Sequence, residues 1–273
     1  MDIDGAFHRP EPFELLLFTT DPSLIAEATR AGMDGYVVDW ERRGKQRRQA
    51  GQNTQINNDT LADLERARAT TTARVLCRLN GFGPWTRREV DAATTAGADE
   101  LLLPMVRNPR EVDAVLRMVR DRCGVGILIE TQDGVRQARE LARRPLSRVY
   151  IGLNDLRIDR GRQDLFEPLV DGTVDEVRRW VDGPRFGVAG LTLPHLGSPV
   201  PTTLIAAELI RLRADFTFLR RSFLADTAGQ PLAPAVTAIR THLAELNGRP
   251  ADERARDREA LVGAVGRRSA VPA

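Results

Sequence analysis

Eight short, strongly apolar segments, each followed by a stretch with helix-like apolar spacing, run through this chain from residue 14 to about residue 245. Several segments are almost wholly apolar, which is typical of parallel strands that helices cover on both faces. Eight strand–helix units in one chain of 273 residues predict an α/β fold, a single-domain (β/α)8 TIM barrel. The expected strands are residues 14–20, 35–41, 73–80, 99–106, 125–131, 148–155, 186–193 and 214–223.

An open, doubly wound sheet is the alternative arrangement of the same units. That fold binds phosphates with a glycine-rich turn after its first strand. Residues 19–24 of this chain read TTDPSL and contain no glycine, which favours the barrel.

Three regions are expected along the chain: an N-terminal extension (1–13), a TIM-barrel catalytic domain (14–248) and a C-terminal helical or flexible tail (249–273). Two connections, 42–59 and 156–172, are longer than the rest and follow the second and sixth strands. Both would lie at the C-terminal face, where barrel enzymes place their active sites. The first is rich in amide and arginine side chains, so it is either a solvated loop or a lid over the substrate.

Local signals predict several helix starts. Asp21 before Pro22 indicates an N-cap followed by a first-turn proline, and Asn108 before Pro109 repeats the pattern. Capping boxes are expected where a Thr or Asn precedes a Glu by three residues. These pairs are Thr86 with Glu89, Asn108 with Glu111, and Thr173 with Glu176.

Composition and charge limit the binding partners and the cellular compartment that are expected for this chain. The formal net charge of +2 gives no electrostatic case for nucleic acid or an anionic membrane. No segment approaches a membrane span and the N-terminus lacks the order of a signal peptide, so a cytoplasmic protein is expected. Lys45 is the only lysine and lies in a polar run, which argues against lysine-imine chemistry because such a lysine needs a dry site.

Two carboxylates close neighbouring strands, Glu130 the fifth and Asp155 the sixth. Adjacent strands in a sheet lie about 4.8 Å apart, so these side chains can share one hard divalent cation at the barrel mouth. Mg²⁺ suits the pair best, because it binds one or two protein carboxylates and keeps waters. The alternative is that Glu130 is structural and bonds to an adjacent loop or helix N-terminus.

Arg78 ends an otherwise apolar third strand. Strand alternation places Arg74 and Arg78 on one face and Cys77 on the other, facing the helices, where we expect core packing and not a nucleophile. A guanidinium at the mouth can bind a carboxylate bidentately or stabilise an oxyanion, or it can pair with a loop acid.

The second strand ends with Asp39 and Glu41 on one face. Both are expected close to Glu130 and Asp155, so four acids would converge with one arginine. Such a cluster is unfavourable unless a cation lies within it. His195, at the end of the seventh strand, is either a structural loop histidine or a proton carrier.

These strand ends resemble the HpcH/HpaI aldolase and citrate lyase β-subunit family, the metal-dependent branch of the phosphoenolpyruvate/pyruvate barrels. The resemblance runs from about residue 14 to about residue 225, in blocks that follow the family's order. The blocks are AGMDGYVVDWE (31–41), CRLN (77–80), AGADELLLPMVRNPREV (96–112), ILIETQDGVRQARELA (127–142) and YIGLNDLRIDRG (150–161).

The resemblance implies a role for each matching position. Glu130 and Asp155 would be the ligands of Mg²⁺ or Mn²⁺, and Arg78 would hold a substrate carboxylate or enolate oxygen. The backbone amides near Asn154 and Asp155 would receive the carboxylate of a 2-oxo acid.

The general base is the point where the chain departs from the family's aldolases. Those aldolases follow the second-strand glutamate with a histidine base, whereas Arg42 follows Glu41 in this chain. Proton transfer is therefore assigned to Glu41 or Asp39, without a choice between them.

The resemblance implies a metal-dependent carbon–carbon lyase, a class II aldolase or citrate-lyase-like enzyme. It would act through a metal-stabilised enolate of a small 2-oxo acid or acyl-CoA. One alternative is a thioester hydrolase or decarboxylase on the same site. Another is a catalytically retired barrel that binds a ligand or partner. A homo-oligomer is implied, with no nucleic acid or membrane partner.

Overall fold

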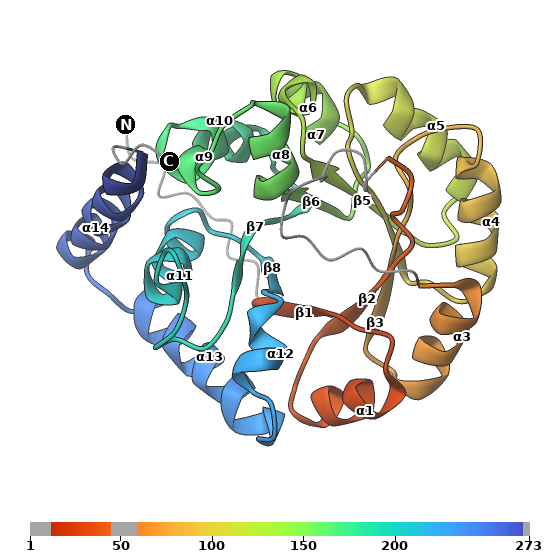
Figure 1. The fold of residues 1–273 in the computed structure, drawn as a ribbon. Helices are drawn as coiled ribbons and strands as arrows, with labels where there is room; N and C mark the ends of the chain where they lie inside the picture. The colour runs from red at the N-terminus through yellow and green to blue at the C-terminus, as the bar shows by residue number, and fades with distance from the viewer. Residues whose placement is uncertain (1–11, 45–58, 270–273) are drawn as a thin grey trace.

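The computed structural model of the protein describes residues 12–44 and 59–269. Within them, eight parallel strands form a closed barrel in chain order, and β1 closes it by pairing with both β2 and β8 (Figure 1). The predicted (β/α)8 barrel is confirmed. The strands are β1 (Glu14–Phe18), β2 (Gly35–Asp39), β3 (Arg74–Arg78), β4 (Glu100–Leu103), β5 (Gly124–Ile129), β6 (Arg148–Ile151), β7 (Arg185–Leu191) and β8 (Phe216–Leu219).

Helices surround the strands, as expected for parallel strands that are apolar on both faces (Figure 1). They are α1 (Pro22–Arg30), α3 (Leu61–Thr70), α4 (Thr86–Thr95), α5 (Pro109–Val119), α6 (Gln132–Arg136), α7 (Ala138–Ala142), α8 (Leu153–Asp159), α9 (Glu167–Val170), α10 (Thr173–Trp180), α11 (Thr202–Arg211), α12 (Ser222–Asp226), α13 (Leu232–Asn247) and α14 (Ala251–Ser269).

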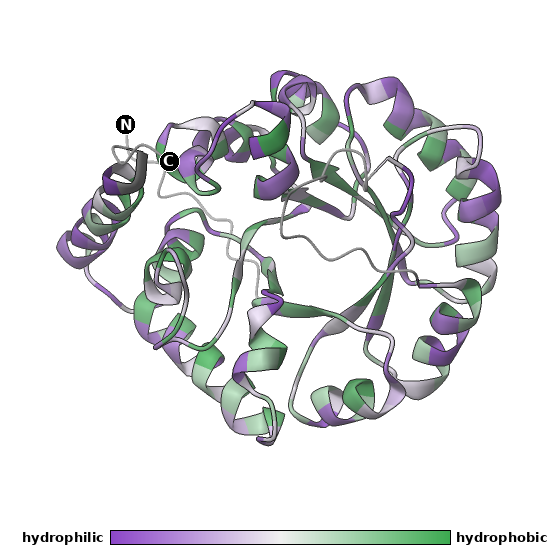
Figure 2. Ribbon diagram, viewed as in Figure 1, coloured by the Kyte–Doolittle hydropathy of each residue, from purple (hydrophilic) through white to green (hydrophobic). Residues whose placement is uncertain are grey.

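Strand alternation divides the apolar side chains into two cores. The larger core lies between strands and helices and includes Val75, Cys77 and Leu79, so the outward position expected for Cys77 is confirmed. A smaller core fills the barrel interior with Leu16, Val37, Leu76, Leu102, Leu128, Phe216 and Phe218. In Figure 2 the strands are largely hydrophobic, while the helices alternate between hydrophobic and hydrophilic faces.

A buried ion cluster closes the N-terminal end of the barrel. Arg148, which begins β6 and is 1% exposed, donates to both carboxylate oxygens of Glu100 at 2.8 and 2.9 Å and to Glu14 at 3.1 Å. Glu100 and Glu14 begin β4 and β1, so the three charges meet at the same end. Buried charges are tolerated when they are paired in this way. The ion cluster therefore fills the N-terminal end of the barrel, and a cavity for a ligand is expected at the C-terminal end.

The predicted helix starts are correct in part. The side chains of Asp21 and Asn108 cap α1 and α5, each followed by its first-turn proline. The two threonine capping boxes are wrong, because α4 and α10 begin at Thr86 and Thr173 themselves, and no side chain caps either helix. Glu89 instead accepts hydrogen bonds from Asn80, which lies just after β3.

The tail contains a long helix, α14, that packs against α11 and α9 on the outside of the ring (Figure 1). Leu261 and Val265 are buried in this contact, and Arg258 donates to the Leu169 carbonyl and pairs with Glu208 at 2.7 Å. None of the helices in the described part of the chain has the length and apolar character needed to cross a membrane.

Candidate active site

A cavity of about 350 Å³ opens at the C-terminal ends of the strands. Its lining includes most of the residues predicted as site residues: Asp39, Arg78, Glu130, Asn154 and Asp155. They arrive from β2, β3, β5 and the first turn of α8, which are far apart in sequence but meet at one end of the barrel. This is the end at which barrel enzymes carry their chemistry.

Glu130 lies directly after β5 and is 4% exposed. Its Oε2 accepts a hydrogen bond from the backbone N–H of Met105 at 3.0 Å. A Cβ atom at Gly152 would lie 2.4 Å from Oε1, so glycine at this position lets the carboxylate rest against the end of β6. Asp155, which is 8% exposed, lies in the first turn of α8 and lines the same cavity.

The electrostatics of Glu130 fit a cation. Burial, followed by repulsion from Asp155 and Glu41, raises the pKa of Glu130 to about 8, although Arg78 and the Met105 amide act in the opposite direction. Two buried carboxylates that repel each other form an oxygen donor set suited to a hard divalent ion. Within residues 12–44 and 59–269, no group of three or more His, Cys, Asp or Glu side chains is arranged to hold a metal ion.

Arg78 is paired with both second-strand acids. Its Nε and Nη2 donate to the two oxygens of Asp39 at 2.8 and 2.7 Å, and Nη1 lies 3.5 Å from Glu41. Burial opposes the guanidinium charge, but Asp39 and Glu41 more than offset it and raise the pKa of Arg78. The ring of Phe18 lies under the guanidinium, 4.9 Å from its centroid to Cζ.

The four acids meet with Arg78 at the mouth of the barrel, where Glu41 is close enough to Glu130 to raise its pKa. Asp39 and Glu41 form a buried ion cluster with Arg78, and the mutually repelling carboxylates Glu130 and Asp155 lie beside it. Strand alternation places all four acids at the mouth, but it does not show that a guanidinium neutralises two of them.

Asn80 fixes the backbone that follows Glu41. Its Oδ1 accepts from the backbone N–H groups of Arg42 and Arg43 at 2.9 and 2.7 Å. Its Nδ2 and backbone N–H donate to Glu89 at 2.7 and 3.1 Å. The Arg42 side chain is exposed, so the residue at the position of the family's histidine does not enter the buried cluster.

Replacing Asn80 by Ala is expected to lower stability by about 2 kcal/mol, because two N–H groups and Glu89 lose a buried partner. We also expect kcat to fall about tenfold as Glu41 loses its fixed position, with KM little changed. Thermal unfolding and steady-state kinetics measure both effects. Wild-type kcat in a folded variant would show that this anchor does not position the site.

Three further sequence predictions concern His195 and the two long connections, 42–59 and 156–172. His195 lies in an exposed turn after β7 and is not among the cavity residues, in agreement with a loop histidine. The 156–172 connection contributes Leu165 and Phe166 to the cavity lining. Most of the 42–59 connection, including Lys45, lies outside the described residues, so its role as loop or lid stays a prediction.

Arg220 and Tyr150 are two of the cavity residues that the sequence analysis does not identify. Arg220 follows β8 and donates from Nε to the Gly190 carbonyl at 2.8 Å. Tyr150, in β6, donates from its hydroxyl to the Ala189 carbonyl at 2.6 Å. Arg220 could have been found, because it continues the inward alternation of Phe216 and Phe218 just as Arg78 continues that of Leu76.

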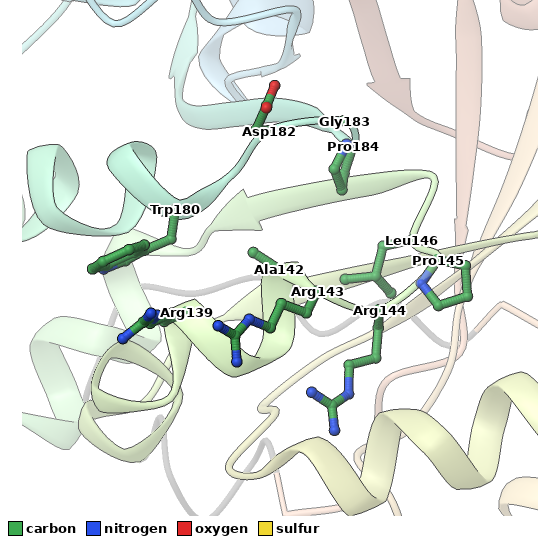
Figure 3. Close-up of a pocket in the computed structure, with 10 residues that line it drawn as sticks. All are labelled: Arg139, Ala142, Arg143, Arg144, Pro145, Leu146, Trp180, Asp182, Gly183 and Pro184. Atoms are coloured by element: carbon green, nitrogen blue, oxygen red, sulfur yellow. The ribbon is translucent and has the colours of Figure 1, made fainter.

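A second hollow of about 600 Å³ lies at the other end of the barrel, between the loops that precede β6 and β7 (Figure 3). Its most prominent contact is Arg139 stacked on the ring of Trp180, with Cζ 4.9 Å from the centroid. Arg143 and Arg144 also line it, and they pair with Glu140 at 2.8 Å and Asp113 at 3.1 Å. It contains none of the predicted site residues.

Comparison with known proteins points to one family. The model of the family described as HpcH/HpaI aldolase/citrate lyase matches residues 14–167, more than half of the chain. Curated relatives include (3S)-malyl-CoA thioesterases from strains of Cereibacter sphaeroides, 33–34% identical over 88 residues. That match covers 32% of this chain and 30% of the length of these relatives.

Solved structures with the same fold include an HpcH/HpaI aldolase from Desulfitobacterium hafniense, with a TM-score of 0.59 and 15% identity over 88% of this chain and 95% of that one. The citrate synthase SbnG also has a TM-score of 0.59, with 18% identity over 79% of this chain and 89% of that one. At these identities the structures support the barrel fold alone.

Proposed function

The chain belongs to the HpcH/HpaI aldolase/citrate lyase family, and from that premise we propose that it is a divalent-metal-dependent carbon–carbon lyase. The substrate would be a small 2-oxo acid or an acyl-CoA that reacts through its enolate. The observation that carries the proposal is the buried pair of mutually repelling carboxylates, Glu130 and Asp155, beside Arg78 in one cavity.

Glu130 and Asp155 would hold Mg²⁺ or Mn²⁺, which when bound supplies Lewis-acid stabilisation of an oxygen on the substrate. Arg78 lines the cavity with its guanidinium oriented by Asp39, and it stabilises negative charge that develops on the substrate. The amides at the start of α8, near Asn154 and Asp155, are proposed from the family resemblance to receive the substrate carboxylate.

Glu41 is the better candidate for proton transfer. Both oxygens of Asp39 accept short hydrogen bonds from Arg78, so this carboxylate is held in place and orients the guanidinium. Glu41 approaches Arg78 at the longer distance of 3.5 Å. We therefore assign the base to Glu41 and the orientation of Arg78 to Asp39.

Thioester hydrolysis is the second candidate, because the curated relatives are named (3S)-malyl-CoA thioesterases. The same site could also decarboxylate a 2-oxo dicarboxylate. A barrel that binds without catalysis is the third candidate. It is disfavoured because a mere binding site has no need for a carboxylate pair, a guanidinium and a buried acid in one cavity.

Malyl-CoA distinguishes these candidates in one assay. A lyase releases acetyl-CoA and glyoxylate, whereas a hydrolase releases malate and the free CoA thiol, which a thiol reagent detects directly. We expect glyoxylate with Mg²⁺ and none after chelation. Free thiol without glyoxylate would establish the hydrolase instead.

Cation affinity is expected to depend on pH through Glu130. Its pKa is raised to about 8, so below that pH a cation must displace a proton, and the affinity falls as pH falls. For one displaced proton, Mn²⁺ should bind about 50-fold more weakly at pH 6 than at pH 8 and gain no more than about twofold above that pH. Calorimetric titration measures this dependence. Equal affinity at pH 6 and pH 8 would contradict it.

A further inference from the structure

Arg220 lies at the part of the cavity formed by β7 and β8. Its Nε is fixed by the Gly190 carbonyl, and its guanidinium lies over the ring of Phe166, 5.6 Å from the centroid to Cζ. A Cβ at Gly190 would lie 3.1 Å from Cγ of Arg220, so the glycine leaves space for this side chain.

The backbone of β7 is shaped around this arginine. The β7–β8 register shifts between Gly187 and Gly190, and Ala189 has a φ of 56°, in the left-handed region that favours glycine. This irregularity directs the Ala189 carbonyl to Tyr150 and the Gly190 carbonyl to Arg220. Bulges beside active sites re-aim groups in this way, at a cost in backbone strain.

Among the described residues, Arg220 has no ion-pair partner that would neutralise its charge. Its Nη2 is buried and, within residues 12–44 and 59–269, has neither a hydrogen-bond partner nor a carboxylate within ion-pair distance of the guanidinium. Burial accordingly lowers its pKa, with Tyr150 and Asp226 acting weakly against this effect. A purely structural arginine would have its donors satisfied, because a buried unpaired cation is costly.

The position of Arg220 separates it from the proposed cation pair. Glu130 follows β5, where Asp155 is its main charged neighbour, and Arg78 ends β3, where Asp39 is its main charged neighbour. Arg220 follows β8, three strands beyond β5 around the barrel, and it lines the same cavity. A ligand whose oxo-acid end lies at Glu130 would therefore present its far end to Arg220.

We propose that Arg220 binds a second carboxylate of the substrate, so that the 2-oxo acid preferred by this site is a dicarboxylate. The inference rests on the function proposed above. A guanidinium fixed through Nε keeps its remaining donors for a planar anion, and a carboxylate matches that geometry. Arg220 is thus assigned as the residue that determines specificity at the far end of the substrate.

The test uses two 2-oxo acids of equal length that differ at one end. 2-Oxoglutarate carries a terminal carboxylate where 2-oxovalerate carries a methyl group. Calorimetry with the Mg²⁺-loaded protein gives the dissociation constants of both for wild type, Arg220→Gln, Arg220→Lys and Arg139→Gln. Arg139 is the matched control, because it also lines a hollow and stacks on an aromatic ring but lies at the opposite end of the barrel.

We expect wild type and Arg139→Gln to prefer 2-oxoglutarate. Arg220→Gln should bind 2-oxoglutarate about 10- to 100-fold more weakly, the loss of one charged hydrogen-bonding group, with 2-oxovalerate unchanged. Arg220→Lys should retain part of the preference, because lysine keeps the positive charge but lacks the planar guanidinium that donates two parallel hydrogen bonds.

Other outcomes separate this inference from the proposed function. Suppose that wild type binds both acids equally in a Mg²⁺-dependent way, or that Arg220→Gln weakens the binding of both acids equally. Arg220 then does not recognise a second carboxylate, while the proposed enolate site is retained. If the preference and its loss are unchanged by chelation, Arg220 has the proposed role and the cation site is wrong. If neither acid binds to wild type, the role of Arg220 is overturned, while the malyl-CoA assay decides the proposed function separately.

Discussion

The Glu130→Gln variant is expected to lose turnover by about 10³-fold, because the loss of one member of the carboxylate pair removes both negative charge and a ligand from the proposed cation site. The substitution is nearly isosteric, and the amide oxygen can still accept from the Met105 N–H, so the fold should be kept. Steady-state kinetics at saturating Mg²⁺, with Mn²⁺ affinity measured in parallel, should show activity and cation binding falling together.

Unfolding experiments on the metal-free protein provide the control. The pKa of Glu130 is raised from 4.5 to about 8, so between these values the folded state binds more protons than the unfolded state. Wild-type stability should therefore be lost progressively as pH rises from 4.5 through 8, and Glu130→Gln should lack this part of the loss. A variant that keeps wild-type turnover would show that Glu130 is structural.

Arg78→Gln is expected to damage both stability and activity. It leaves Asp39 and Glu41, each 1% exposed or less, buried without their cation, which costs about 3–5 kcal/mol. Turnover should fall by about 10²- to 10³-fold, because the charge that faces the developing anion is removed. Denaturant unfolding and kinetics on the same preparations measure the two effects.

Two further variants separate these effects. The double variant Asp39→Asn with Arg78→Gln also removes one of the two carboxylates that Arg78 neutralises in wild type. It should therefore recover part of the lost free energy of unfolding, while turnover stays low. Arg66→Gln breaks an exposed pair with Asp63 and should cost less than about 1 kcal/mol. If Arg78→Gln is as mild as Arg66→Gln, the buried cluster does not stabilise the mouth.

The fold could be predicted from sequence because the strands of a barrel are apolar on both faces and regularly spaced. Each of the eight expected segments overlaps an observed strand. The eighth was predicted too long, since 214–223 contains only β8 (Phe216–Leu219) before α12 begins at Ser222. Apolar residues continue into that helix, and apolar content alone does not mark where extended backbone ends.

The site was predicted less completely, for two physical reasons. Strand alternation shows which charges face inward, but the partner of each charge depends on contacts across the barrel, as with Arg78 and Asp39. Backbone groups carry no sequence signal, so the Met105 amide and the carbonyls of the β7 irregularity could not be anticipated. Capping boxes failed where a glutamate had a stronger tertiary partner, as Glu89 has in Asn80.

The central claim is that Glu130 and Asp155 hold a cation that promotes enolate formation in the cavity beside Arg78. Exchange of the methyl protons of pyruvate with deuterated water, followed by NMR, tests it without knowledge of the natural substrate. We expect exchange with Mg²⁺ or Mn²⁺ that stops on chelation and resumes when the cation is restored. Exchange that is indifferent to chelation, or no exchange at any cation concentration, would contradict the claim.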